Sequence, residues 1–180
     1  MHYFNETITT YGTLFLAVTS FFSVRIAYSA IQKQAEQQEK ADKNFQLSMM
    51  IDLAAKLDLQ FNSMDFKKER TLAANSLLNQ TDLSNAENVF DFFETLGLYL
   101  KLGAINSDVV YKFFFHWINI YWVASKEYIS LKRQKSKALW NDFEYLYNTM
   151  IEIERVNDYN SKDLQPTDKS LKEYLLEEIN

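Results

Sequence analysis

Few side chains in this sequence have the types and spacings that catalysis or metal binding requires. His116 is the only histidine beyond the extreme N-terminus, and the chain contains no cysteine. A zinc or di-iron site therefore lacks a ligand set, because no second histidine and no Glu-x-x-His spacing accompanies His116. A serine or threonine nucleophile would depend on the same residue as its base. We predict no enzymatic activity, no metal and no cofactor, and we expect His116 to be a hydrogen-bonded histidine in an aromatic core.

Four charged residues inside or near apolar stretches are more informative. Glu94 lies in FDFFETLGL and Glu144 lies in LWNDFEYL, and Arg70 and Arg133 are the arginines nearest to these segments. A buried lone charge is costly, so a carboxylate that faces the core needs a partner. We predict that Arg70 or Arg133 pairs with Glu94 or Glu144 across adjacent helices and fixes their register. The alternative is that both glutamates point to solvent.

A basic stretch from 126 to 137 is the other concentration of charge. It carries five cations against one acid, Glu127, which gives a net charge of +4. Such a stretch is able to contact anionic headgroups or a phosphate-bearing ligand. The alternative is that the cations favour the dipole at a helix C-terminus and solvate the loop that follows. The cations are Lys126, Lys132, Arg133, Lys135 and Lys137.

The composition predicts that long helices position these residues. Among 180 residues there are only 3 glycines and 1 proline, whereas a sheet protein of this length needs many tight turns. The aromatic share of 16% is large enough to build a substantial core. The net charge of −5 argues against a nucleic-acid binder, which needs a basic surface for phosphates. The predicted fold class is all-α.

The N-terminal segment has the properties of a membrane span. No charged residue occurs from Thr7 to Val24, and apolar character resumes after Arg25 as far as Ile31. At about 1.5 Å per residue the uncharged run covers roughly 27 Å, close to the ~30 Å hydrocarbon core of a bilayer. We predict a single transmembrane helix over 7–31, from whose end Arg25 snorkels to the headgroups.

Three small residues of this helix, Thr19, Ser23 and Ala27, recur at four-residue spacing, which is compatible with close packing against a partner helix. Two other interpretations of the segment remain open. One is a cleaved signal peptide, since Ala27-Tyr28-Ser29 resembles a cleavage site, although no Lys or Arg precedes the run. The other is a buried helix of a soluble protein.

The charges on either side of the run predict its orientation. Only Glu6 is charged before the run, whereas Arg25, Lys33, Lys40 and Lys43 follow it. Positive residues near the end of a span favour the cytoplasmic side. We therefore predict that the N-terminus lies outside the membrane and the C-terminal part of the chain lies in the cytoplasm.

Four segments follow from the pattern along the chain. These are a tail and span over 1–31, a polar helical stalk over 32–60, a bundle of about five helices over 61–158, and a loop with an acidic C-terminal helix over 159–180. A capping box at Ser84 and Glu87 predicts one helix start, and Gly103 predicts the end of that helix. The apolar stretch 109–131 is interrupted by polar residues, so we expect a core helix there and no second span. The bundle-facing stripe of the stalk is Met50, Leu53, Ala54, Leu57 and Phe61.

Several segments together support a resemblance. They are Arg70 with Ala73-Ala74 and Leu77-Leu78, FDFFETLGLYLKLGAINSDVVY at 90–111, IYW at 120–122, Arg133, and LWNDFEYL at 139–146. In this order, after a span and a polar stalk, they resemble the bacterial family known as domain of unknown function 4760. The resemblance implies a membrane-associated helical protein without an assigned activity, some of whose relatives are thought to lie near phage-defence genes.

The expected function is that of a single-pass protein of the bacterial inner membrane acting as an interaction or regulatory module. Its expected partners are the lipid bilayer and either another protein or further copies of itself. The alternative is a small membrane effector that oligomerises through its span when the soluble domain senses a signal. Expression toxicity that disappears when 1–31 is deleted would favour the effector.

Overall fold

The protein is all-α, as its composition predicts. The computed structural model describes the backbone of residues 2–157 and 166–179, and the side chains of residue 16 and of residues 19–157 and 166–179. In this part of the chain there are six α-helices, one 3-10 helix and no strand. The elements are α1 (His2–Phe61), α2 (Met64–Asn79), η1 (Leu83–Ala86), α3 (Glu87–Lys101), α4 (Ser107–Arg133), α5 (Asn141–Asn157) and α6 (Asp168–Ile179).

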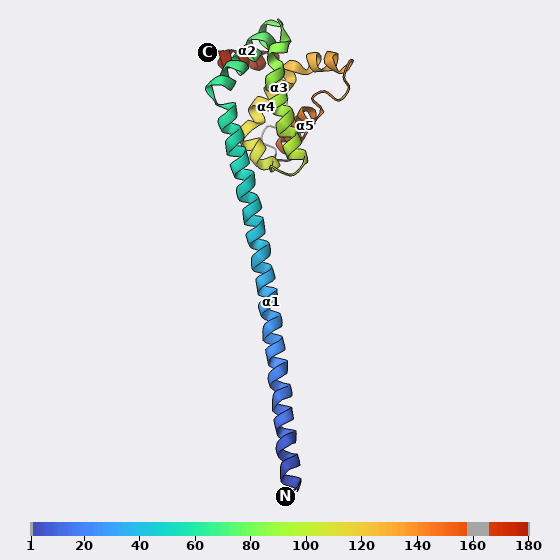
Figure 1. Cartoon of the computed structure of the whole chain (residues 1–180). Helices are drawn as coiled ribbons and strands as arrows, with labels where there is room; N and C mark the ends of the chain where they lie inside the picture. Colours follow the sequence, from blue (N-terminus) through green and yellow to red (C-terminus); the bar gives the residue numbers. More distant parts are fainter. Residues whose placement is uncertain (1, 158–165, 180) are drawn as a thin grey trace. The chain divides into compact units, whose positions relative to one another are not determined.

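The chain divides into two compact units, Met1–Ser48 and Met49–Asn180, and α1 is one continuous helix that contributes to both (Figure 1). In the first unit every described side chain of α1 is exposed. In the second unit the predicted apolar stripe of α1 packs against the bundle, which confirms that part of the sequence analysis. Ala54, Leu57 and Phe61 are buried, and Met50 and Leu53 are partly buried.

Aromatic side chains form the centre of the second unit. The ring of Phe61 lies within 6 Å of five other rings, including Phe92 at 5.2 Å. Phe93 stacks on Phe143 with 5.0 Å between centroids, and Trp122 meets Phe143 edge-on at the same distance. Such pairs contribute roughly 0.5–1.5 kcal/mol each beyond the area they bury. Aromatic side chains of α1, α3, α4 and α5 therefore meet in one core.

Local signals determine two helix boundaries, of which the end of α3 at Gly103 is as predicted. The Asn106 side chain accepts a hydrogen bond from the Asp108 backbone N–H at 2.7 Å and begins α4. Gly103 follows α3 with a φ of 70°, and the next N–H donates to the Tyr99 carbonyl at 2.9 Å, which is a Schellman closure. The apolar stretch 109–131 lies within α4, and its buried face belongs to the core of the bundle, as predicted.

The predicted capping box at the start of the third helix is wrong. Asp82 begins the 3-10 helix η1 and accepts both the backbone N–H and the hydroxyl of Ser84. The helix α3 then starts at Glu87 without a side-chain cap. Glu87 instead binds Lys132 and Tyr128 of α4, at 2.7 and 2.6 Å. A tertiary contact has replaced the local one, because two donors on a neighbouring helix stabilise a carboxylate better than one backbone N–H.

Candidate functional site

A buried arginine holds the C-terminal helix α6 on the bundle. Arg70 of α2 donates from Nε and Nη2 to the two carboxylate oxygens of Glu178, both at 2.8 Å. Each side chain of this pair is only 7% exposed. The third guanidinium nitrogen donates to the Phe61 carbonyl at 3.0 Å. A buried arginine with a bidentate partner and a backbone acceptor has most of its donors satisfied, which is the condition under which such a pair is tolerated.

Aromatic rings enclose this ion pair. The Arg70 guanidinium lies 4.1 Å from the centroid of Phe61 and 4.8 Å from that of Trp117, within range of cation–π attraction. The Tyr121 hydroxyl is 3.3 Å from the Arg70 carbonyl and 3.4 Å from Glu178. Burial, with the charge of Glu178 beside it, raises the pKa of Tyr121, so this hydroxyl stays a neutral donor. We call Arg70, Glu178, Phe61, Trp117 and Tyr121 the Arg70 centre.

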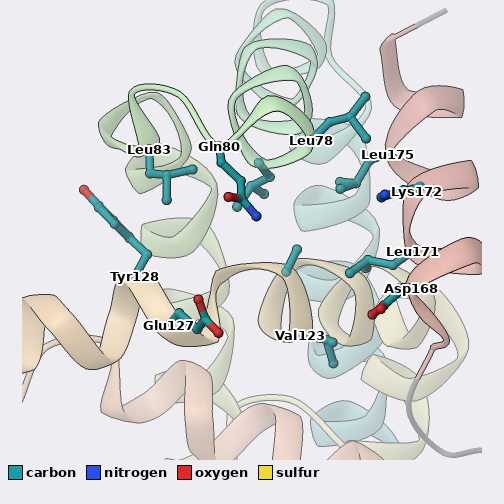
Figure 2. A pocket seen from close by; sticks show the side chains of 12 residues that line it. Leu78, Gln80, Leu83, Val123, Glu127, Tyr128, Asp168, Leu171, Lys172 and Leu175 are labelled. Atoms are coloured by element: carbon teal, nitrogen blue, oxygen red, sulfur yellow. The ribbon is translucent and has the colours of Figure 1, made fainter.

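A groove lies between the C-terminal end of α2, η1, α4 and α6, with a volume of about 490 Å³. This volume falls within the range of small-molecule and peptide side-chain sites. Seven of its twelve lining residues are apolar and come from four elements, and Figure 2 shows the Gln80 amide directed into the space between them. The apolar lining is Leu77, Leu78, Leu83, Val123, Ala124, Leu171 and Leu175, and the polar lining is Gln80, Glu127, Tyr128, Asp168 and Lys172.

Local structure constrains two polar residues of the groove, Gln80 and Tyr128. Gln80 caps α2 with a left-handed backbone, at φ 50°, which few residues other than Gly and Asn adopt. The hydroxyl of Tyr128 donates to Glu87, and hydrogen bonds from Lys132 and Tyr128 lower the pKa of Glu87. Among the described residues there is no group of three or more His, Cys, Asp or Glu that could hold a metal. The polar groups of the groove are able to exchange hydrogen bonds with a ligand or a partner.

The structure pairs one of the predicted arginines with a predicted glutamate. Arg133, at the end of α4, donates to Glu144 of α5 at 2.5 Å and to the carbonyls of Leu139 and Trp140 at 2.7 and 2.9 Å. The guanidinium thus closes the turn between α4 and α5, in which Trp140 has a φ of 52°. We call Arg133, Leu139, Trp140 and Glu144 the Arg133 corner.

The other two predicted partners do not pair with each other. Arg70 binds Glu178, which the sequence analysis did not consider. Glu94 is half-buried and accepts the Phe143 backbone N–H at 2.7 Å, at the start of α5. Burial raises the pKa of Glu94 despite this hydrogen bond. Glu94 therefore acts as a helix cap supplied from α3 and not as half of an ion pair.

The basic stretch separates into two groups. Lys132 and Arg133 are engaged in the structural ion pairs with Glu87 and Glu144. The side chains of Lys126, Lys135 and Lys137 are exposed. Contact with anionic headgroups is therefore a hypothesis about these three lysines only, since the other two cations already bind carboxylates.

The expectation for His116 was wrong. Its side chain is exposed, and it contacts the edges of aromatic rings at the surface. Its ring lies 4.4 Å from that of Tyr174 on α6 and 5.1 Å from that of Trp117. Partial desolvation by these rings lowers the pKa of His116. Position 116 follows the buried Phe114 by two residues, which rotates it away from the core face of α4.

The small-residue stripe of the predicted span lies in α1. The hydroxyls of Thr19 and Ser23 donate to the carbonyls of Leu16 and Thr19, at 3.0 and 2.9 Å. Within the part of the chain that the structure describes, no helix is both long and apolar enough to cross a membrane. The uncharged run over 7–24 falls mainly on residues 7–15, 17 and 18, whose side chains lie outside the described ones.

Comparison with known proteins gives a family and no activity. The model of the family described as "Domain of unknown function (DUF4760)" matches residues 7–150, which includes most of α1 and the helices α2 to α4. No curated protein and no solved structure matches the chain.

Proposed function

Since the chain belongs to the DUF4760 family, whose description assigns no activity, we propose from its own residues that it is a membrane-tethered helical interaction module. In this proposal the segment 7–31 of α1 anchors the protein in a bilayer, and the second unit binds a protein partner on the cytoplasmic side. The proposal also predicts an N-terminus on the opposite side, because the cations Arg25, Lys33, Lys40 and Lys43 all follow the uncharged run.

The observation that supports the tether best is the distribution of apolar side chains on α1. Six large apolar residues between 16 and 31 are more than half exposed. At about 100° per residue they are spread around the helix axis and form no single stripe. A helix that is apolar on several sides is typical of a protein core or a lipid environment, whereas an amphipathic surface helix has one apolar face. The six are Leu16, Phe21, Phe22, Val24, Ile26 and Ile31.

The hydroxyl groups of the same segment are compatible with lipid. Thr19, Ser20, Ser23 and Ser29 each donate to a backbone carbonyl three or four residues earlier, at 2.7–3.0 Å. A hydroxyl that is bonded inside its own helix does not need water, so the cost of placing it in hydrocarbon is reduced. These four hydroxyls are therefore compatible with a membrane span.

Membrane fractionation with matched variants tests the tether. Phe21→Lys with Val24→Lys places two charges within the proposed span, and we expect the protein to become extractable by alkaline carbonate. Phe45→Lys with Leu47→Lys changes equally exposed apolar residues of the same helix outside the span, and we expect this variant to stay in the membrane pellet. Wild-type protein in the soluble fraction would contradict the tether.

A pull-down from membranes in mild detergent, read by mass spectrometry, tests the interaction role. We expect a partner that wild-type protein retains and that Leu83→Lys, in the groove, releases. Leu131→Lys is the control, because Leu131 is 61% exposed and does not line the groove. Equal recovery with both variants would exclude the groove as the binding surface. Toxicity on expression that requires 1–31 and no partner would instead support a membrane effector.

A further inference from the structure

An exposed face of α2 carries an apolar hollow bordered by lysines. Met64 and Leu72 are large apolar residues that are 75% and 51% exposed. Together with Thr71 and two exposed lysines, Lys67 and Lys68, they line a hollow of about 430 Å³. The spacing i, i+3, i+4, i+7 and i+8 places all five residues on one face of the helix. Large apolar side chains that gather in one hollow with a polar border are typical of a protein contact.

The outer face of α6 carries an exposed leucine and two glutamates, which complement the apolar and basic residues of the hollow on α2. Leu176 is 46% exposed, and Glu173 and Glu177 lie three residues before it and one residue after it. At about 100° per residue these positions fall within one face of the helix, on which the leucine lies beside the two carboxylates. Both carboxylates are exposed. Glu173 contacts Lys169 at 3.9 Å, which is a weak ion pair.

The two faces belong to neighbouring helices of one unit. The Thr71 hydroxyl donates to the Glu178 carbonyl at 3.1 Å, and the Arg70–Glu178 pair joins the same two helices (Figure 1). A surface that contains both a hollow and its complementary projection can pair with itself about a twofold axis, because each copy then offers both halves. A heterologous partner would have to reproduce both features, whereas a second copy has them already.

We propose that two copies of this protein associate through α2 and α6. Leu176 of each copy enters the hollow between Met64 and Leu72 of the other, and Glu173 and Glu177 face Lys67 and Lys68. The apolar contacts supply the affinity, and the charges at the rim set the orientation and accelerate encounter. In a shared bilayer the association would be stronger because tethering raises the effective concentration, and this increase rests on the proposed membrane anchor.

Cysteine crosslinking of the full-length protein tests the pairing, since the chain contains no cysteine of its own. One population carries Leu72→Cys and a second, separately tagged population carries Leu176→Cys, so that a disulfide between the two tags is intermolecular. We expect the mixed disulfide to form at least tenfold faster than one between Leu131→Cys and Leu176→Cys. Leu131 is also well exposed but lies on α4.

Charge reversal distinguishes this pairing from random collision. Lys67→Glu with Lys68→Glu in the Leu72→Cys population should abolish the rate advantage, since like charges then face each other. Glu173→Lys with Glu177→Lys in the Leu176→Cys population should restore it. Crosslinking no faster than the Leu131→Cys control, or a rate that charge reversal leaves unchanged, would overturn the proposal. Repeating the mixture in detergent separates the two inferences, because loss of the tether lowers the rate without removing the charge dependence.

Discussion

The Arg70 centre and the Arg133 corner both pair an arginine with a carboxylate, but the two pairs differ in how deeply they are buried. Each guanidinium binds a carboxylate and at least one backbone carbonyl, and each lies near an aromatic ring. The Arg70 side chain is 7% exposed and joins residues 108 positions apart. The Arg133 side chain is 21% exposed, and its partner Glu144 is 11 positions away and 43% exposed. The first therefore determines tertiary structure, and the second determines the shape of one turn.

The burial of an ion pair also determines how much stability is lost when one partner is removed. Water can replace a partner at the Arg133 corner, where Glu144 reaches solvent. At the Arg70 centre both side chains are only 7% exposed, so removing one partner leaves an unpaired charge that is largely buried. We therefore expect mutation of Arg70, which holds α6, to reduce stability more than mutation of Arg133, which closes the α4–α5 turn.

The largest effect is expected for Arg70→Met. The change leaves Glu178 buried without a counter-charge, and we expect a loss of roughly 3–5 kcal/mol in the free energy of unfolding. Urea unfolding followed by near-ultraviolet circular dichroism measures it. The double variant Arg70→Met with Glu178→Leu should recover much of the loss, because an apolar pair of similar size packs without a desolvation cost. A single variant as stable as wild type would show that α6 is not held by this pair.

Gly97→Ala tests the close contact between α3 and α5 at Asp142, two residues before Glu144 of the Arg133 corner. A Cβ at Gly97 would lie 2.0 Å from the Asp142 carbonyl oxygen, so α3 and α5 must separate to admit it. We expect a loss of about 1–3 kcal/mol from this overpacking, measured by the same unfolding curves. Gly103→Asn is the control, because nothing lies near that position and Asn tolerates its positive φ. Equal stability of the two variants would mean that the α3–α5 contact yields easily.

A smaller loss, about 1–2 kcal/mol, is expected for Arg133→Met, since two backbone carbonyls and Glu144 lose a charged donor but retain access to water. Arg133→Lys keeps the charge and loses the planar fork, so it should recover only part of the stability. Thermal melting compares the three proteins. A loss as large as that of Arg70→Met would mean that burial does not determine how much stability the Arg70 centre and the Arg133 corner each contribute.

Contacts between residues that are close in the sequence could be predicted, whereas contacts between distant residues could not. The pair of Arg133 and Glu144 is one of the four predicted combinations, because Arg133 lies close in sequence to the apolar segment that contains Glu144. Glu178 was missed because it lies in an exposed-looking acidic segment, and only the fold brings that segment to Arg70. The helices, the end of α3 at Gly103 and the core stripe of α1 follow from periodicity and turn chemistry. The capping box at Ser84 was wrong because Glu87 makes a tertiary contact with α4 instead. The prediction for His116 was wrong because position 116 lies on a different face of α4 from the buried Phe114.

The smallest expected effect is on the pH dependence of stability, to which two glutamates of α3, Glu94 and Glu87, should contribute in opposite directions. Folding raises the pKa of Glu94 from 4.5 because burial disfavours its charge, whereas hydrogen bonds from Lys132 and Tyr128 lower the pKa of Glu87 from the same value. The contribution of Glu94 to stability is therefore present below about pH 4.5 and is lost as pH rises through its folded pKa. That of Glu87 is present above about pH 4.5 and is lost as pH falls through its folded pKa.

Matched glutamine variants measure these opposite slopes through the melting temperature between pH 2 and pH 7, because the folded pKa of Glu87 lies below 4.5. Glu94→Gln should match wild type at low pH and equal or exceed it at neutral pH, because the amide oxygen still accepts the Phe143 N–H without a charge to desolvate. Glu87→Gln should also match wild type at low pH but fall below it at neutral pH, where the carboxylate binds Lys132. The same sign for both variants would mean that burial does not control Glu94. Opposite signs would show that two carboxylates on one helix, seven residues apart, differ because one caps a buried helix start and the other faces a cation at the surface.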